Sequence, residues 1–408
     1  MSQNVDSPLA LKPLPYHEAI REYLKTEEPE IWQWYASNRV RAEQADAIRF
    51  ELLKSTYRVD RDTQPELYAI ADEVARRLSL TAAVTIYQAQ NPEGLNASLA
   101  YVPGEAHLVL HGPVRSRLTE PEFRALVAHE LSHLLLWQEW DGDYLVVDQI
   151  LAALSLDPEA ETPHFASIRL LRLYNEIFCD RGALSVAGDP GVCISMLVKI
   201  ATGLDEVSPE SYVRQAEEIF TKKPTKAAEL THPEAFIRAR ALTLWFDGNP
   251  EADAKIRAMI EGQPALDELD LLGQKQVAGL TRRLLDVLLA PKWFQSELVL
   301  AHARLFFDDY VPPEALREDE LPADAIRTDD AAMQDYYCYV LLDFATADRD
   351  LEDLPLAAAL TVADKLGLKP RFREIARKEL RLRLKQLDTL DEEKEAILAD
   401  AGQGSAKK

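Results

Sequence analysis

Apolar residues recur at three- and four-residue steps between Tyr16 and Leu80. The repeat runs through Ile31, Trp34, Val40 and Ile48, and then through Leu67, Ile70, Val74 and Leu78. This spacing places apolar side chains on one face of an α-helix, where they can pack against a core. The pattern predicts a helical N-terminal segment over residues 1–62, and then a further helix that opens a domain over residues 63–248.

Between Val84 and His111 the pattern changes to short runs of β-prone residues. These runs are Val84–Tyr87, Ala97–Val102 and His107–His111, and turn-forming residues at 91–94 and 103–104 separate them. Short runs bounded by Asn, Pro and Gly are typical of neighbouring strands. The sequence predicts a small, mainly antiparallel sheet.

A capped helix follows this sheet. Thr119 stands in the capping position, Pro121 fits the first turn, and Glu122 completes a capping box. The pair Asp141-Gly142 predicts the end of this helix, and a second helical block covers about residues 165–186.

After Pro233 the sequence is almost entirely helical in pattern, with breaks at proline and glycine. We place a boundary near Asn249, which gives an all-helical C-terminal domain over 249–401 and a disordered tail over 402–408. The predicted fold class is therefore α+β, with a mixed domain followed by an all-α domain.

Charge and composition exclude several classes of protein. The formal net charge of −23 repels phosphate-rich surfaces, so neither nucleic acid nor an anionic membrane is expected as a partner. No run of 18 apolar residues and no secretory signal is visible, which predicts a cytoplasmic protein without membrane insertion. The three cysteines, Cys179, Cys193 and Cys338, fit a reducing compartment and are expected to be buried, inert thiols.

The capped helix contains the motif HExxH. Residues four apart lie on the same face of a helix, so the imidazoles of His129 and His133 can converge on one cation. Glu130 lies about 100° further round and can reach a metal-bound water rather than the metal. Zinc lowers the pKa of such a water to about 7. These residues predict one catalytic Zn²⁺ with Glu130 as the general base.

A catalytic zinc needs a third protein ligand and one open position. The metzincin class would have Gly at position 136 and His or Asp at position 139, but this chain has Leu136 and Glu139. A glutamate on a later helix, the gluzincin arrangement, is available as Glu176. Asp180 lies one turn further on the same face and can accept the free ring N–H of a ligating histidine. A solvated acidic face is the alternative for this segment.

These motifs give the chain a family resemblance over residues 67–244. The pattern ExxxDRxA after HExxH resembles the zinc metallopeptidases that include HtpX and the CAAX prenyl proteases. Three further segments are similar to that family: the Asn-Ala strand at Asn96 and Ala97 with the strand after it, the acidic opening of the HExxH helix, and a late His-Pro at His232 with Arg238.

The resemblance implies roles for these additional residues. His232 and Arg238 would lie near the zinc and stabilise the oxyanion of the tetrahedral intermediate, although Arg240 could replace Arg238 in a shifted register. Asn96 and Ala97 would lie on the edge strand that binds an extended peptide. The membrane-bound members carry hydrophobic spans, which this chain lacks, so prenylated or membrane-embedded substrates are not expected.

The sequence therefore predicts a zinc-dependent metalloendopeptidase of the gluzincin type, acting on a protein or peptide. Two alternatives remain open. The first is a catalytically silent, zinc-containing chaperone-like or adaptor protein, and the second is a zinc hydrolase acting on a non-peptide amide. The helical C-terminal domain offers surface for a protein partner or for self-association.

Overall fold

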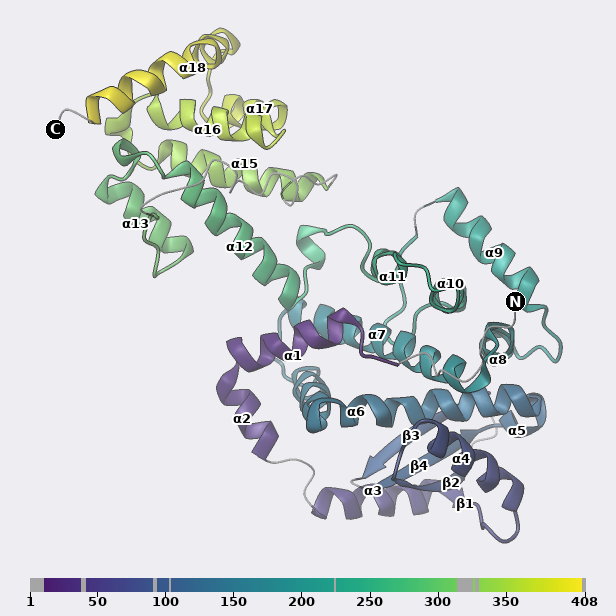
Figure 1. The fold of residues 1–408 in the computed structure, drawn as a ribbon. Helices are drawn as coiled ribbons and strands as arrows, with labels where there is room; N and C mark the ends of the chain where they lie inside the picture. The colour runs from purple at the N-terminus through teal and green to yellow at the C-terminus, as the bar shows by residue number, and fades with distance from the viewer. Residues whose placement is uncertain are drawn as a thin grey trace. The chain divides into compact units, whose positions relative to one another are not determined.

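The computed structural model describes residues 11–37, 42–90, 94–102, 104–223, 225–313, 326 and 330–405. The chain forms two compact units, Met1–Gly262 and Gln263–Lys408 (Figure 1). The first combines a four-stranded sheet with helices, and the described part of the second is helical, so the α+β class is confirmed. The sequence placed the division near Asn249, whereas α11 (Ala252–Glu261) packs against α7 and α10 and stays with the first unit.

The sheet has the strand order β1-β2-β4-β3, with β3 at one end. Its strands are β1 (Thr56–Arg58), β2 (Ala83–Ala89), β3 (Asn96–Val102) and β4 (Glu105–His111). The pairs β1–β2 and β3–β4 are antiparallel, and β2–β4 is parallel. The three predicted strands are present. The sequence did not predict β1, because three residues directly after a helix carry no alternating pattern and only the pairing with β2 makes them a strand.

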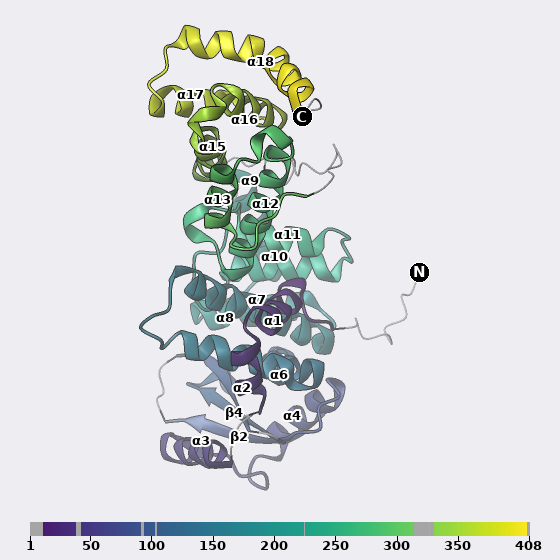
Figure 2. The ribbon, with the colours of Figure 1, turned by 90° about the vertical axis from the view of Figure 1, so that its left-hand side faces the viewer.

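The sheet is covered by helices on both faces. Tyr87 and Val109 pack against Leu52 of α3 (Ala42–Ser55) on one face. On the other face, Ile86 and Leu108 join the main core with α4 (Pro65–Arg77) and α6 (Glu120–Leu154). Figure 1 and Figure 2 show the strands between α3 and α6. This layering holds the HExxH helix directly against the sheet.

The beginning of α6 is fixed by a buried carboxylate. The backbone N–H of Thr119 donates to Glu122 Oε2 at 2.8 Å, as the predicted capping box requires. Glu122 also accepts from Ser195 Oγ at 2.6 Å and from Lys199 Nζ at 2.9 Å, both on α8 (Pro190–Thr202). One side chain therefore caps α6 and joins it to α8.

The predicted end of this helix at Asp141-Gly142 is a break after which the helix resumes. Trp140, Asp141 and Gly142 have φ values of 52°, 58° and 85°, and α6 then continues to Leu154. Helix α1 (Pro15–Glu27) holds the break in place. The guanidinium of Arg21 lies 4.2 Å from the centre of the Trp140 ring, and Lys25 pairs with Asp143 at 2.5 Å.

Helix α1 also packs on α7 (Thr162–Ala187), the second helical block predicted from the sequence. Tyr16 stacks on Tyr174 with ring centres 4.8 Å apart. His17 is fully buried among aromatic rings, and its Nδ1 accepts from the backbone N–H of Leu14 at 3.1 Å. Burial lowers the pKa of His17 to about 3, so this imidazole is neutral in the folded protein.

The remaining elements complete the two units. The first unit also contains α2 (Pro29–Ser37), α5 (Val114–Arg117), α9 (Pro209–Lys222) and α10 (Ala235–Phe246). The second contains α12 (Leu271–Leu288), α13 (Glu297–Phe306), α15 (Ala331–Thr346), α16 (Leu354–Lys365), α17 (Lys369–Glu379) and α18 (Leu384–Ser405), with single 3₁₀ turns between some of them.

The core of the second unit is apolar and aromatic, with Leu284, Phe294, Phe344 and Leu360 fully buried. A tail was predicted from residue 402, but α18 continues to Ser405. The predicted apolar position Val40 and the predicted turn residues 91–93 and Pro103 lie outside the described residues. Within the described part of the chain, no helix combines the length and the apolar character needed to cross a lipid bilayer.

Substitution of His17 by Asn should make the protein less sensitive to acid. The unfolded chain binds a proton at His17 below its ordinary pKa of 6.5, whereas the folded chain does not until about pH 3. Below pH 6.5, the unfolding free energy of the wild type should therefore fall by about 1.4 kcal/mol per pH unit because of this group. The variant should not show this loss. Denaturant unfolding of both proteins between pH 7.5 and 5 measures this difference, and a gap that stays constant with pH would contradict it.

Substitution of Gly182 by Ala should destabilise the contact between α6 and α7. A Cβ at this position would lie 1.9 Å from Ser132 Oγ and 2.7 Å from Ser132 Cβ, and rotation of the hydroxyl cannot move the latter. Overpacking of this kind costs about 1–3 kcal/mol.

Gly279→Ala is the matched control. This glycine is an exposed position within α12 where a Cβ meets nothing within 4 Å. The substitution there should be neutral or stabilising, because alanine has the higher helix propensity. Equal unfolding midpoints for the wild type and Gly182→Ala would contradict the predicted clash.

Candidate metal centre

Helices α6 and α7 bring the three predicted metal ligands together. His129 Nε2 lies 3.4 Å from Glu176 Oε2, and His133 Nε2 lies 3.7 Å from Glu176 Oε1. The side chains of His129 and Glu176 are almost completely buried, and that of His133 is 20% exposed. Both imidazoles come from successive turns of α6, and the carboxylate faces them from α7.

The geometry of these atoms suits a small divalent cation. A tetrahedral zinc with bonds of about 2.0–2.1 Å separates its ligand atoms by about 3.4 Å, close to both of the separations in this site. Glu176 Oε2 is buried and accepts no hydrogen bond of good geometry from the described residues, although Arg238 Nη1 lies 3.2 Å away. A buried carboxylate oxygen in that position is costly unless a cation compensates it.

Asp180 and Arg238 support this group from behind. His129 Nδ1 lies 3.1 Å from Asp180 Oδ1, and Nε2 is turned toward Glu176. Arg238 on α10 donates from Nη2 and Nε to the two oxygens of Asp180 at 2.6 and 2.7 Å. A carboxylate behind a ligating histidine fixes its tautomer and raises its basicity.

The electrostatics of the site favour a positive charge at its centre. Burial alone would lower the pKa of His129, but Glu176 and Asp180 outweigh it and raise that pKa to about 10. Burial would raise the pKa of Glu176, but Arg238 and His129 hold it far below its ordinary value. For His133, burial dominates and lowers the pKa to about 4. A metal ion would compete with the proton of His129, since a ligating imidazole must be neutral.

Glu130 is buried beside this group. Loss of solvent raises the pKa of Glu130 to about 8, with a further contribution from the charge of Glu176. A carboxylate whose pKa is near neutrality is suited to exchange protons during catalysis, and such shifts are concentrated at functional sites.

His232 and Arg238 differ in how deeply they are buried. His232 Nε2 is 3.6 Å from Glu176 Oε1, and its side chain is 55% exposed. Arg238 is 8% exposed and points into the site. Arg240 instead lies over the ring of Phe220 and 4.0 Å from Glu217, both on α9. The arginine beside the predicted ligands is therefore Arg238.

The predicted substrate strand lies next to α6. Ala97 on β3 is buried in the core, and Asn96 is exposed. From the same strand, the Tyr101 ring lies 5.8 Å from that of Trp137, which in turn lies 6.2 Å from His133. These rings connect the end strand of the sheet with the candidate metal site. Peptide binding along β3 remains a prediction.

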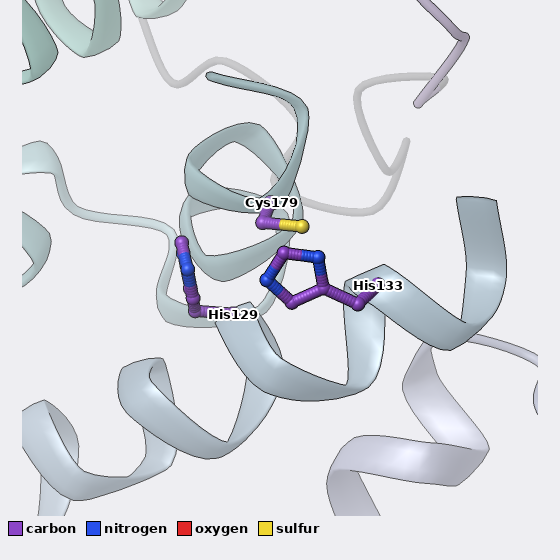
Figure 3. A group of neighbouring side chains, drawn as sticks. All are labelled: His129, His133 and Cys179. Carbon is purple, nitrogen blue, oxygen red and sulfur yellow. The ribbon is translucent and has the colours of Figure 1, made fainter. Parts of the chain in front are cut away.

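One further residue reaches the site, and the sequence analysis had set it aside. Cys179 is buried and free, as expected, but its Sγ and ring nitrogens of His129 and His133 all lie within 4.8 Å of one another (Figure 3). Cys179 comes three residues after Glu176 on α7, and this spacing was the signal in the sequence that could have predicted its place at the site. Burial and the neighbouring carboxylates raise the pKa of Cys179 well above its ordinary value, which a bound cation would reverse.

Comparison with known proteins finds a similarity to a metallopeptidase over part of the chain. The chain is similar to Plastoglobule-localized metallopeptidase 48, chloroplastic, of Arabidopsis thaliana, with 28% identity over 204 residues. The matched region is 46% of this chain and 58% of the plant protein, so the chain spans little more than half of that relative. No protein-family model and no solved structure matches the chain.

Substitution of Asp180 by Asn should weaken metal binding. The amide keeps the shape of the side chain but removes the charge that orients His129 and anchors Arg238. Loss of such a partner lowers metal affinity by about 10–100-fold. Competition with a chromogenic chelator measures the zinc affinity. Asp253→Asn is the control, because Asp253 pairs with Arg181 through an exposed carboxylate. Equal affinities in both variants would contradict the role of Asp180.

Proposed function

We propose that this chain is a zinc-dependent metalloendopeptidase with His129, His133 and Glu176 as ligands and Glu130 as the general base. The observation that carries the proposal is the proximity of two imidazoles to one buried carboxylate: His129 Nε2 lies 3.4 Å from Glu176 Oε2, and His133 Nε2 lies 3.7 Å from Glu176 Oε1. The likeness to a metallopeptidase supports peptide hydrolysis as the reaction. The ExxxDRxA pattern favours the HtpX and CAAX protease type within the gluzincins.

The bound cation would supply a polarised water and a polarised substrate carbonyl. The chain's own residues would perform the proton transfers. Glu130 takes a proton from the attacking water and delivers it to the amine of the leaving product. Burial raises the pKa of Glu130 to about 8 in the absence of a cation, and a bound Zn²⁺ beside it would lower that pKa and favour the carboxylate that accepts the proton.

Arg238 and His232 have different roles in this proposal. Arg238 uses three of its nitrogens on Asp180 and Glu176, so we assign it to holding those carboxylates in place. His232 is more exposed and lies 3.6 Å from Glu176, which makes it the better candidate for an oxyanion donor.

The substrate class follows from the peptidase activity: a protein or peptide in extended form, with β3 as the candidate binding strand. A cytoplasmic location remains the prediction from the sequence. The name of the plant relative places that protein in chloroplast plastoglobules.

Replacement of Glu130 by Gln tests this function. The variant should retain zinc and lose about 10²–10⁴-fold in kcat/KM, because the amide cannot accept the proton of the water. Mass spectrometry of products from an unfolded protein substrate measures cleavage, and internal fragments identify an endopeptidase. Glu120→Gln is the control, since Glu120 is an exposed carboxylate on the same helix, paired with Arg124.

The result also decides between the alternatives. Cleavage that persists in Glu130→Gln would overturn the assigned base. A zinc-loaded wild type that cleaves no protein would favour an adaptor protein, or a hydrolase for non-peptide amides if it hydrolyses small amides instead.

A further inference from the structure

Cys179 stands among the candidate ligands and has no role in the mechanism above. Residues three apart on a helix share a face, so Glu176 and Cys179 both project from α7 toward α6. Figure 3 shows the thiol beside the rings of His129 and His133, and the ligand atoms of these three residues lie within 4.8 Å of one another. The side chain of Cys179 is fully buried.

A second observation concerns the carboxylate on the same face of α7. Glu176 Oε2 is buried without a hydrogen bond of good geometry from the described residues, and it lies 3.4 Å from His129 Nε2 and 3.2 Å from Arg238 Nη1. Sulfur and imidazole together are a typical donor set for zinc, with Zn–S bonds of about 2.3 Å. Movements of about 1 Å would bring the thiol and imidazole donors to bonding distance of one ion, given their separation of up to 4.8 Å.

We infer that Cys179 is a fourth ligand of the metal when no substrate is bound. The ion is then held by His129, His133, Glu176 and Cys179, and the sulfur occupies the position that the attacking water needs. The inference assumes the metal of the proposed function, but it does not depend on peptide hydrolysis.

The exchange of ligands is balanced without any change in oxidation state. When the sulfur binds, the bond between the metal and a water oxygen breaks, a metal–sulfur bond forms, and the thiol proton passes to solvent water. When a substrate enters, the metal–sulfur bond breaks, a bond between the metal and a water oxygen forms again, and the sulfur takes a proton from solvent water. A closed, four-coordinate site is typical of structural zinc, whereas catalysis requires an open position. Cys179 would thus restrain hydrolysis until a substrate displaces it.

Cobalt provides a direct spectroscopic test on the full-length protein. Co²⁺ is added under reducing conditions to protein freed of metal. Wild type should show the visible bands of tetrahedral cobalt together with an intense sulfur-to-cobalt charge-transfer band in the near ultraviolet. Cys179→Ser should keep cobalt binding and lose the charge-transfer band. Cys338→Ser is the matched control, because Cys338 is equally buried but belongs to the second unit, and it should retain the band.

Each result supports or overturns the inference. Tetrahedral visible bands without a charge-transfer band in the wild type would show that the thiol is no ligand, and so would a band that survives in Cys179→Ser. Cys179→Ala replaces the serine variant if that protein does not fold. The wild-type spectrum tests for a sulfur ligand without any variant.

The experiment separates this inference from the proposed function. A charge-transfer band in a protein whose zinc form cleaves no peptide would support the ligand and reject the peptidase. Cleavage of peptides by a protein without the charge-transfer band would support the peptidase and reject the ligand. In Glu130→Gln, a bound peptide should weaken the band, and an unchanged band at a saturating concentration of peptide would contradict displacement by substrate.

Discussion

The first unit depends on a group of buried charges between α6 and α7. Glu130, Glu176 and Asp180 are carboxyl groups in the interior, and Arg238 is the permanent cation among them. Buried charges are tolerated only when partners of opposite charge compensate them. Arg238 satisfies Asp180 and part of Glu176, and the remaining negative charge raises the pKa of His129. A divalent cation at the same point would complete the compensation.

A single face of α7 supplies most of this arrangement. Glu176, Cys179 and Asp180 are spaced by three and four residues, so one helix presents a carboxylate, a thiol and an orienting carboxylate to the histidines of α6. Gly182 lets the two helices approach closely, because a Cβ there would lie 2.7 Å from Ser132 Cβ. The same two helices carry the groups that lie 3.4 and 3.7 Å apart at the site.

The predictions that succeeded were based on local patterns in the sequence. A capping box and a four-residue repeat of histidines are properties of one helix, so α6 and the convergence of His129 with His133 could be predicted. Features that depend on tertiary contacts could not. Strand β1 exists only through its pairing with β2, and the left-handed break at Trp140 is held by α1. The proximity of Cys179 to the histidines depends on how α7 rotates against α6.

Under the proposed function, the exposure of the site residues indicates the side from which a peptide would enter. His129, Glu130, Glu176 and Arg238 are buried, whereas the side chain of His232 is 55% exposed and that of His133 is 20% exposed. Access is therefore on the side of these two histidines. From His133, Trp137 leads to Tyr101 on β3, the strand at the end of the sheet. An extended chain paired with β3 would pass this aromatic pair on its way to the metal, and the rings would then contact its apolar side chains.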